Sequence, residues 1–251
     1  MKPGTNVNPK PNEPLKKDTP GNEEVVDLGK GVKLDLVLIP AGKFKMGSPE
    51  SEVGRVNNEI QHEVTLTKPY YMGKYEVTQE QYEGVIGNNP SSTKGAKLPV
   101  TDVSWEDCQE FIKKLNAKTS GGYRLPTEAE WEFACRAGTT TAYSFGDVIT
   151  PKDANYNESG GRIMEVGSYK ANGFGLYDMH GNVWEWCEDR GGDYPAGAIT
   201  DPKGAATGDR RVLRGGSFGD GESTARSSNR NLDVSPAVRL VNVGFRLART
   251  P

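Results

Sequence analysis

The chain has 251 residues, and its 31 lysines and arginines against 34 aspartates and glutamates give a formal charge of −3. This balance excludes non-specific coating of nucleic acid, which requires a strongly basic surface. No apolar run is long enough to cross a bilayer, and the first ten residues lack the apolar core of a secretory signal.

Glycine and proline are frequent, with 31 and 16 residues, while four tryptophans, ten tyrosines and seven phenylalanines supply a substantial core. The composition therefore predicts a loop-rich globular protein. Only three cysteines are present, Cys108, Cys135 and Cys187. They are too few for a disulfide scaffold, although the sequence leaves open one bridge, such as Cys135 to Cys187.

The N-terminal segment differs from the rest of the chain. Residues 1–25 contain five prolines and almost no large apolar side chain, so we expect a flexible tether followed by one domain over residues 26–251. Alternating apolar residues predict a strand over 32–39, in a hairpin with 43–47. A second strand is expected over 62–67.

Three short helices are predicted from their starting residues. The first follows Thr78, which forms a capping box with Gln81, and it ends near Gly87. The second begins at Ser104 and carries apolar residues at spacings of three and four. The third begins at Thr127, with a glutamate three residues later.

The pattern changes after Gly138. Glycine, asparagine, aspartate and serine then interrupt the chain every few residues, and no long helical periodicity or fixed-length repeat is visible. The remaining hundred or so residues are therefore predicted to form loops on a small sheet. The aromatic residues embedded in them argue against disorder.

Seven segments, in order, resemble the formylglycine-generating-enzyme, or sulfatase-modifying-factor, domain over about residues 30–249. They read LIPAGKFKMGS, YEVTQEQY, PVTDVSWEDCQEFIKKLN, YRLPTEAEWEFACRAG, GFGLYDMHGNVWEWCED, RVLRGGSF and GFRLA. The resemblance implies an α+β fold of the C-type lectin type, irregular and loop-rich, with a small mixed sheet, short helices and a ligand-binding surface built by C-terminal loops.

Members of this family differ in function, so the site residues have to distinguish them. The formylglycine-generating enzymes bind copper(I) through two cysteines that follow the RGGS turn. The corresponding positions here hold Asp220 and Ala225. A related branch of iron-dependent sulfoxide synthases uses a histidine cluster, whereas this chain has only His62 and His180. The sequence therefore predicts no cofactor for catalysis.

The chain is most similar to a third branch, the variable proteins of diversity-generating retroelements, including treponemal variable lipoproteins. In that branch, fixed residues alternate with mutable ones. The fixed residues here would be the stretch from Arg211 to Ser217, then Arg226, Arg230, Pro236, Arg239 and Gly244-Phe245-Arg246. The mutable residues would be Phe218, Gly219, Asp220, Gly221, Ser223, Thr224, Ala225, Asn231, Leu232, Asp233, Val238, Leu240 and Asn242. In the retroelement proteins, mutagenesis of adenines in asparagine-type codons produces a limited set of residue types. By that resemblance, all thirteen residues belong to the set.

The fixed residue types suit this role. Arginine holds carbonyls and carboxylates through paired hydrogen bonds, and glycine adopts backbone conformations that other residues resist. The thirteen residues between them, which we call the C-terminal face, are then free to contact a ligand. An ordinary region of solvated loops is the alternative interpretation.

We therefore expect a non-enzymatic, surface-displayed ligand-binding protein, with a variable region at about residues 211–247. Its ligand would be an unidentified protein or glycan on another cell or host surface. The membrane would be reached only through an N-terminal lipid anchor, as in an outer-membrane lipoprotein. The alternative is an enzyme of the same superfamily with non-copper chemistry, using Asp220 or Glu222.

The DMHGNVWEW segment also resembles a calcium loop of the enzyme branch. Calcium takes oxygen ligands, and these would come from Asp178 and Glu185 and from the carbonyls of Gly181 and Val183. Such an ion would be structural. The alternative is that the two carboxylates form caps or salt bridges within the turn.

The remaining polar candidates receive structural interpretations. His62 and His180 are expected to be hydrogen-bonded, non-catalytic residues. Cys108 and Cys135 are expected in the core. The row formed by Glu128, Glu130 and Glu132 is interpreted as the solvated face of the third helix.

Overall fold

The computed structural model describes residues 23–251. Most of the predicted tether lies outside the described residues. Its last three residues do not belong to a tether, because β1 (Glu23–Gly29) begins at Glu23 and pairs along β2 (Val32–Ile39). Local composition missed this strand because its stability comes from the ladder with β2.

Three small sheets form the framework. The largest has the order β1-β2-β5-β12-β6, with β5 at Tyr70–Gly73, β6 at Tyr123–Arg124 and β12 at Ala248–Arg249. The second has the order β10-β9-β7-β11, with β7 at Trp184–Arg190, β9 at Arg211–Arg214, β10 at Arg230–Val234 and β11 at Val243–Gly244. The third has the order β3-β4-β8, with β3 at Gly42–Met46, β4 at His62–Leu66 and β8 at Ile199–Thr200.

The predicted hairpin between residues 32–39 and 43–47 is wrong. Both strands exist, but β2 pairs with β1 and β5, whereas β3 pairs antiparallel with β4. The chain passes to a different sheet after Pro40, a residue that lacks the N–H a ladder requires. Alternation shows which side chains face the core but not which strand is the neighbour.

All three predicted helices are present. They are α1 (Gln79–Ile86), α2 (Trp105–Lys118) and α3 (Glu128–Arg136), and each begins with a capping box. Gly87 ends α1 in the left-handed conformation, at φ 101°. Beyond α3 the described chain contains only two short 3-10 helices, η1 (Asn157–Ser159) and η2 (Glu222–Ala225). The α+β, loop-rich architecture is as predicted.

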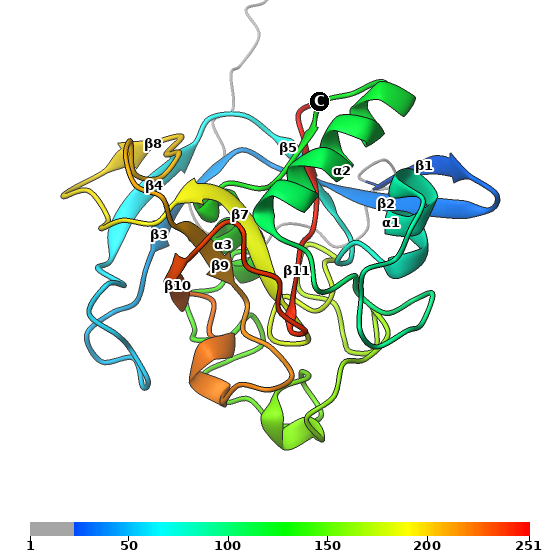
Figure 1. The fold of residues 1–251 in the computed structure, drawn as a ribbon. Helices are drawn as coiled ribbons and strands as arrows, with labels where there is room; N and C mark the ends of the chain where they lie inside the picture. Colours follow the sequence, from blue (N-terminus) through cyan, green and yellow to red (C-terminus); the bar gives the residue numbers. More distant parts are fainter. Residues whose placement is uncertain (1–22) are drawn as a thin grey trace, which may run out of the picture.

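Two large apolar clusters make the core. One joins α1 and α2 to Trp184, Trp186 and Phe245, and the other surrounds Trp131 of α3. A third, smaller cluster lies beneath η2 and includes Tyr143 and Tyr156. The long loops gather at the lower end of Figure 1, opposite the C-terminus. Among the described residues, no helix combines the length and apolar character needed to cross a membrane.

Candidate functional site

The C-terminal segment crosses the lower half of the molecule in two passes. It runs through β9, the turn at residues 215–217 and η2, returns along β10, and reaches β11 through a loop at residues 235–242 (Figure 1). β9, β10 and β11 belong to one sheet, so their register fixes the ends of every loop between them. Of the thirteen residues of the C-terminal face, seven lie on these loops, Ser223, Thr224 and Ala225 lie on η2, and Asn231, Leu232 and Asp233 lie within β10.

Four arginines of this segment have their side chains inside the protein. Arg214 and Arg246 are fully buried, and Arg226 and Arg230 are nearly so. Each contacts a glutamate from another part of the chain. Because both partners are removed from water, each pair fixes the position of its arginine. Removal of either partner would leave the other charge buried and uncompensated.

Arg214 and Arg230 join the segment to α3. Arg230 makes two hydrogen bonds with Glu128, at 2.7 and 2.6 Å. Arg214 is paired with Glu132 and also donates to the carbonyls of Ser228 at 2.9 Å and Ser227 at 3.1 Å. One guanidinium therefore fixes both the α3 face and the approach to β10.

These contacts correct the interpretation of the glutamate row. Glu128 and Glu132 are 3% and 0% exposed, and neither lies on a solvated face. Glu130 is also largely buried, with hydrogen bonds of 2.6 Å from Arg124 to both of its carboxylate oxygens. The spacing alone predicts an exposed stripe, because the arginine partners are distant in sequence and leave no local signal.

Arg226 connects the segment to a loop near the N-terminus. Its guanidinium bonds both oxygens of Glu59, at 2.7 and 2.8 Å, and one oxygen of Glu52, at 2.6 Å. It also donates to the carbonyl of Gly54 at 2.7 Å. Nothing in the sequence analysis placed the loop at residues 49–60 beside the C-terminal face.

Arg246 and Arg239 show the two extremes of this pattern. Arg246 forms a paired contact with Glu185, at 2.6 and 2.7 Å, and is fully buried. Arg239 makes a similar pair with Asp107, at 2.7 and 2.8 Å, but the arginine side chain is 54% exposed. The second pair lies in water, so its contribution to stability is small.

Two glycines shape the turn after β9. Gly215 and Gly216 have φ values of 97° and 73°, which disfavour any other residue. A side-chain carbon at Gly216 would lie 2.9 Å from the carbonyl carbon of Thr224 and 3.0 Å from the nitrogen of Ala225. The turn and η2 therefore approach closely only because this position has no side chain.

Twelve of the thirteen residues of the C-terminal face reach solvent at least in part. Gly219, Ser223, Asp233 and Leu240 are exposed, and Phe218, Asp220, Gly221, Thr224, Asn231, Leu232, Val238 and Asn242 are partly exposed. Ala225 is a correction, because it is 1% exposed and belongs to the cluster beneath η2. Its side chain cannot contact a ligand on the surface.

Asp220 takes part in a polar cluster. The indole of Trp184 donates to its carboxylate at 2.9 Å, and the hydroxyl of Ser217 donates to the same oxygen. The amide of Asn242 donates to Ser217 at 3.0 Å. The cluster therefore ties the start of η2 to β7 and to the loop before β11, through oxygen acceptors and without a thiol.

The two carboxylates predicted as calcium ligands, Glu185 and Asp178, have other partners. Glu185 accepts hydrogen bonds from Arg246 and, at 2.7 Å, from the indole of Trp131. The other two predicted ligands are the carbonyls of Gly181 and Val183. Both residues lie beside the C-terminal segment, where the amide of Gly181 donates to the carbonyl of Gly215 and the side chain of Val183 packs against Gly244. Among residues 23–251, no group of three or more histidines, cysteines, aspartates and glutamates is arranged to hold a metal. Arg246 thus supplies the positive charge that Glu185 needs.

Asp178, the remaining predicted ligand, has an altered ionisation. Its carboxylate accepts the amide of Gly167 at 2.6 Å, and burial raises its pKa to about 6. Burial, together with the charge of Asp178, also raises the pKa of Glu76 well above its usual value. Calcium at this turn stays a prediction.

The histidines and cysteines occupy structural positions. His180 is buried, with its ring nitrogens 2.8 Å from the Ala225 carbonyl and 2.9 Å from the Ser144 hydroxyl, and burial lowers its pKa to about 4. His62 lies against the ring of Tyr194. The three cysteines are buried and free, so Cys135 and Cys187 form no bridge.

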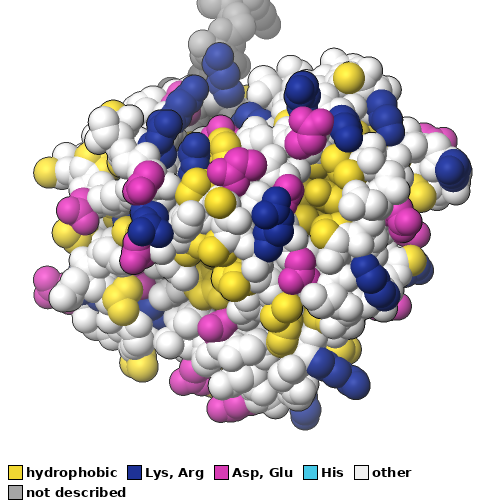
Figure 2. Space-filling view, in the orientation of Figure 1, with side chains coloured by type: hydrophobic (Ala, Val, Ile, Leu, Met, Phe, Trp, Pro, Cys, Tyr) yellow, Lys and Arg dark blue, Asp and Glu magenta, His cyan; other side chains and the backbone are white. Residues whose placement is uncertain are grey.

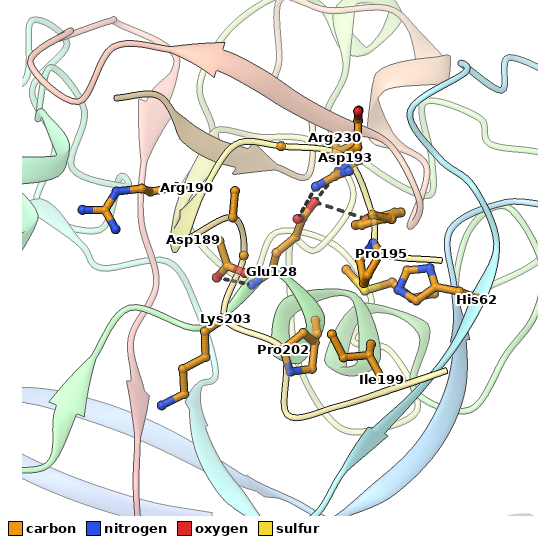
Figure 3. A pocket seen from close by; sticks show the side chains of 16 residues that line it. His62, Glu128, Asp189, Arg190, Asp193, Pro195, Ile199, Pro202, Lys203 and Arg230 are labelled. Carbon is orange, nitrogen blue, oxygen red and sulfur yellow. Dashed lines mark hydrogen bonds and ion pairs between the residues drawn. The ribbon is translucent and has the colours of Figure 1, made fainter. Parts of the chain in front are cut away.

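One cavity of the structure is not anticipated from the sequence. A cavity of about 280 Å³ lies between the start of α3, the end of β7 and the following loop. Figure 3 shows Asp189 beside the backbone of Glu128, whose amide donates to it at 2.9 Å. Burial raises the pKa of Asp189 to about 8. Arg230 also lines this cavity and so connects it to β10.

The comparisons with known proteins identify the family. Residues 29–251 match the model of the sulfatase-modifying factor enzyme 1-like domain. The chain belongs to this family. Its structure is similar to that of Treponema denticola variable protein 1, with a TM-score of 0.83 and 32% identity, covering 93% of this chain and 100% of the other. PvdO from Pseudomonas aeruginosa gives 0.81 and 30%, covering 94% and 100%.

Curated relatives of the family include enzymes. The chain is 36% identical to the formylglycine-generating enzyme of Thermomonospora curvata, over 86% of this chain and 93% of that protein. It is 38% identical to the enzyme of Streptomyces coelicolor over 60% of this chain, but spans only about half, 52%, of that relative's length. It spans 38% of a Chlamydia caviae protein named serine/threonine-protein kinase pkn1, at 33% identity over 86% of this chain. The predicted fold type is confirmed, and the family contains proteins with different functions.

Proposed function

We propose that this protein is a ligand-binding protein, and that the C-terminal face, without Ala225, is its binding surface. The observation that carries the proposal is the contrast within one segment. Four of its arginines are buried against glutamates of distant elements, whereas the twelve remaining residues of the C-terminal face reach solvent at least in part. A surface held in this way tolerates changes of side chain without loss of the fold.

Asp220 and Ala225 stand where the formylglycine-generating enzymes have their copper-binding cysteines, and these two residues support a role other than copper catalysis. Copper(I) prefers soft thiolate ligands. Asp220 offers oxygen atoms that already accept hydrogen bonds, and Ala225 has no ligand atom in its side chain. The three cysteines lie elsewhere in the core, where burial raises the pKa of each thiol, that of Cys135 to about 12.

Further parts of the proposal concern the biology of the protein. We propose that it is displayed on the cell surface through an N-terminal lipid anchor and that a retroelement diversifies the C-terminal face. The similarity to Treponema denticola variable protein 1 supports this, whereas the similarity to formylglycine-generating enzymes favours the alternative of an enzyme. The ligand belongs to another cell or a host surface.

Two measurements test the proposal. In the first, the C-terminal face of a sibling copy is grafted onto this chain, and both proteins are probed on the same glycan and protein arrays. Changed binding with an unchanged melting temperature is expected, and identical binding would contradict the assignment of the face. In the second, a sulfatase-type cysteine peptide is incubated with the protein and copper(I), and formation of an aldehyde would establish the enzyme alternative.

A further inference from the structure

Exposed apolar side chains are concentrated beside the C-terminal face. Eight large hydrophobic residues are exposed within the part of the chain that the structure describes: Val25, Val53, Val56, Ile60, Phe145, Val148, Leu240 and Val241. Two of them, Leu240 and Val241, lie in the loop that precedes β11. Five more lie in residues 53–60 and 145–148, and only Val25 lies on β1, in a different sheet from the C-terminal strands.

The loop at residues 53–60 adjoins η2 on one side. Arg226 binds the carbonyl of Gly54 and the carboxylates of Glu52 and Glu59, and a side-chain carbon at Gly54 would lie 2.9 Å from the β-carbon of Ser223. Val53, at the tip of the loop, is 88% exposed. A buried arginine therefore holds an apolar side chain out in water next to the C-terminal face.

Residues 145–148 adjoin η2 through another contact. The hydroxyl of Tyr143 donates to the carbonyl of Glu222 at 2.9 Å, and its ring stacks on Phe145 with centroids 5.5 Å apart. Phe145 is 43% exposed and Val148 is 75% exposed. Two segments that are distant in sequence thus present apolar side chains next to the same short helix.

The exposed charged side chains of these segments are mostly acidic. Glu52 and Glu59 are both paired with Arg226, which leaves one negative charge in excess, and Glu50, Asp147 and Glu222 are exposed. Within residues 49–60, 142–148 and 217–225, Arg55 is the only lysine or arginine. Figure 2 shows apolar and acidic side chains next to one another on the lower left of this view. A partner would therefore match the surface with apolar and basic groups.

We propose that Val53, Val56, Ile60, Phe145 and Val148 form a constant apolar rim of the binding surface, and that the partner is a protein with an apolar patch bordered by lysine or arginine. This inference rests on the proposed function of the C-terminal face. Contiguous exposed apolar groups mark protein contacts. Four of the five rim side chains are aliphatic, and these offer neither hydrogen bonds nor an aromatic ring to a sugar.

Peptides selected from a displayed random library on the full chain supply the probe. Their affinities are then measured by fluorescence anisotropy for the wild type and three variants. The rim variant carries Val53→Ser and Phe145→Ser, the face variant carries Asp233→Arg and Leu240→Arg, and the control carries Val25→Ser. All five positions are exposed, so melting temperatures are expected to stay close to that of the wild type.

We expect the selected peptides to combine apolar with basic residues. The rim and face variants should each bind about tenfold more weakly, as loss of a contributing contact does, and the control should bind like the wild type. If only the face variant loses affinity, the rim is excluded while the proposed function stands. If neither loses affinity, or if ligands are found only on a glycan array, the proposal of a protein-binding rim is wrong. A dimer that the rim variant abolishes would also overturn it, because a second copy would then be the partner.

Discussion

Replacing Arg226 by methionine tests whether buried pairs hold the C-terminal segment. Arg226 is 1% exposed and Glu59 is fully buried, and two hydrogen bonds of 2.7 and 2.8 Å join them. In Arg226→Met the Glu59 carboxylate remains in the interior without its cation. Breaking a buried pair from one side costs about 3–5 kcal/mol, so we expect the free energy of unfolding to fall by roughly that amount.

The loss should depend on pH. Burial alone would raise the pKa of Glu59, but hydrogen bonds from Arg226 and Ser48 and the charge of Arg226 outweigh it and hold the pKa below its usual value. This contribution to wild-type stability is therefore complete above about pH 4.5 and is lost as the pH falls through the lower, folded-state pKa. In the variant, burial dominates and the pKa of Glu59 rises. Acidification then protonates the carboxyl and reduces the difference from the wild type.

Urea unfolding followed by tryptophan fluorescence at about pH 5 and about pH 7.5 measures both effects. The double variant Arg226→Met with Glu59→Gln should recover much of the loss, because the fully buried carboxylate is then replaced by a neutral amide. Only Glu52 still lacks its cation, and it keeps a hydrogen bond from the hydroxyl of Ser228, at 2.7 Å. Arg239→Met is the matched control, since its pair with Asp107 is exposed and worth less than about 1 kcal/mol. Equal losses for Arg226→Met at the two pH values, or no recovery in the double variant, would refute the reasoning.

Three further outcomes are expected. Gly216→Ala should destabilise the protein by about 1–3 kcal/mol in urea unfolding, because φ is 73° and the new methyl group would contact Thr224, whereas Gly219→Ala should change little. Asp189→Asn should stabilise the protein at about pH 8. Burial raises the pKa of Asp189 to about 8. The contribution of this carboxyl to wild-type stability is therefore full below about pH 3.8 and is lost as the pH rises toward 8. If the difference in stability between Asp189→Asn and the wild type does not change across that pH range, the reasoning is wrong. Asp233→Ala should change the unfolding free energy by no more than about 0.5 kcal/mol, measured in the same way, because this side chain is exposed.

The helices were predictable because their signals are local. Each capping box involves only four consecutive residues at the start of its helix, and the structure shows all three boxes. The partners of the strands were not predictable in the same way. Residues 32–39 carry a clear alternation, but that pattern is satisfied equally by a neighbour at 43–47 and by the true neighbours β1 and β5. Sheet order depends on long-range packing, which a local pattern does not encode.

The constrained framework of the C-terminal segment was predictable in outline for a different reason. Arginine and glycine at fixed places indicated a constrained segment, and the resemblance supplied the positions between them. The sequence did not reveal where the arginines point, so the glutamates of α3 were assigned to solvent although Glu132 is fully buried. Ala225 was assigned to the surface because a small residue in a glycine-rich segment carries no sign of its burial.

The loop at residues 49–60 shows how one contact can serve stability and recognition together. Arg226 pairs with Glu59 and Glu52 in the interior, and the same guanidinium donates to the carbonyl of Gly54. This contact fixes Val53 in water next to Ser223 without any requirement on the identity of Ser223. Exchange of residues on the C-terminal face therefore leaves the position of the rim unchanged. A diversified surface built on this scaffold would accordingly keep one constant apolar border, to which each new set of side chains adds its own specificity.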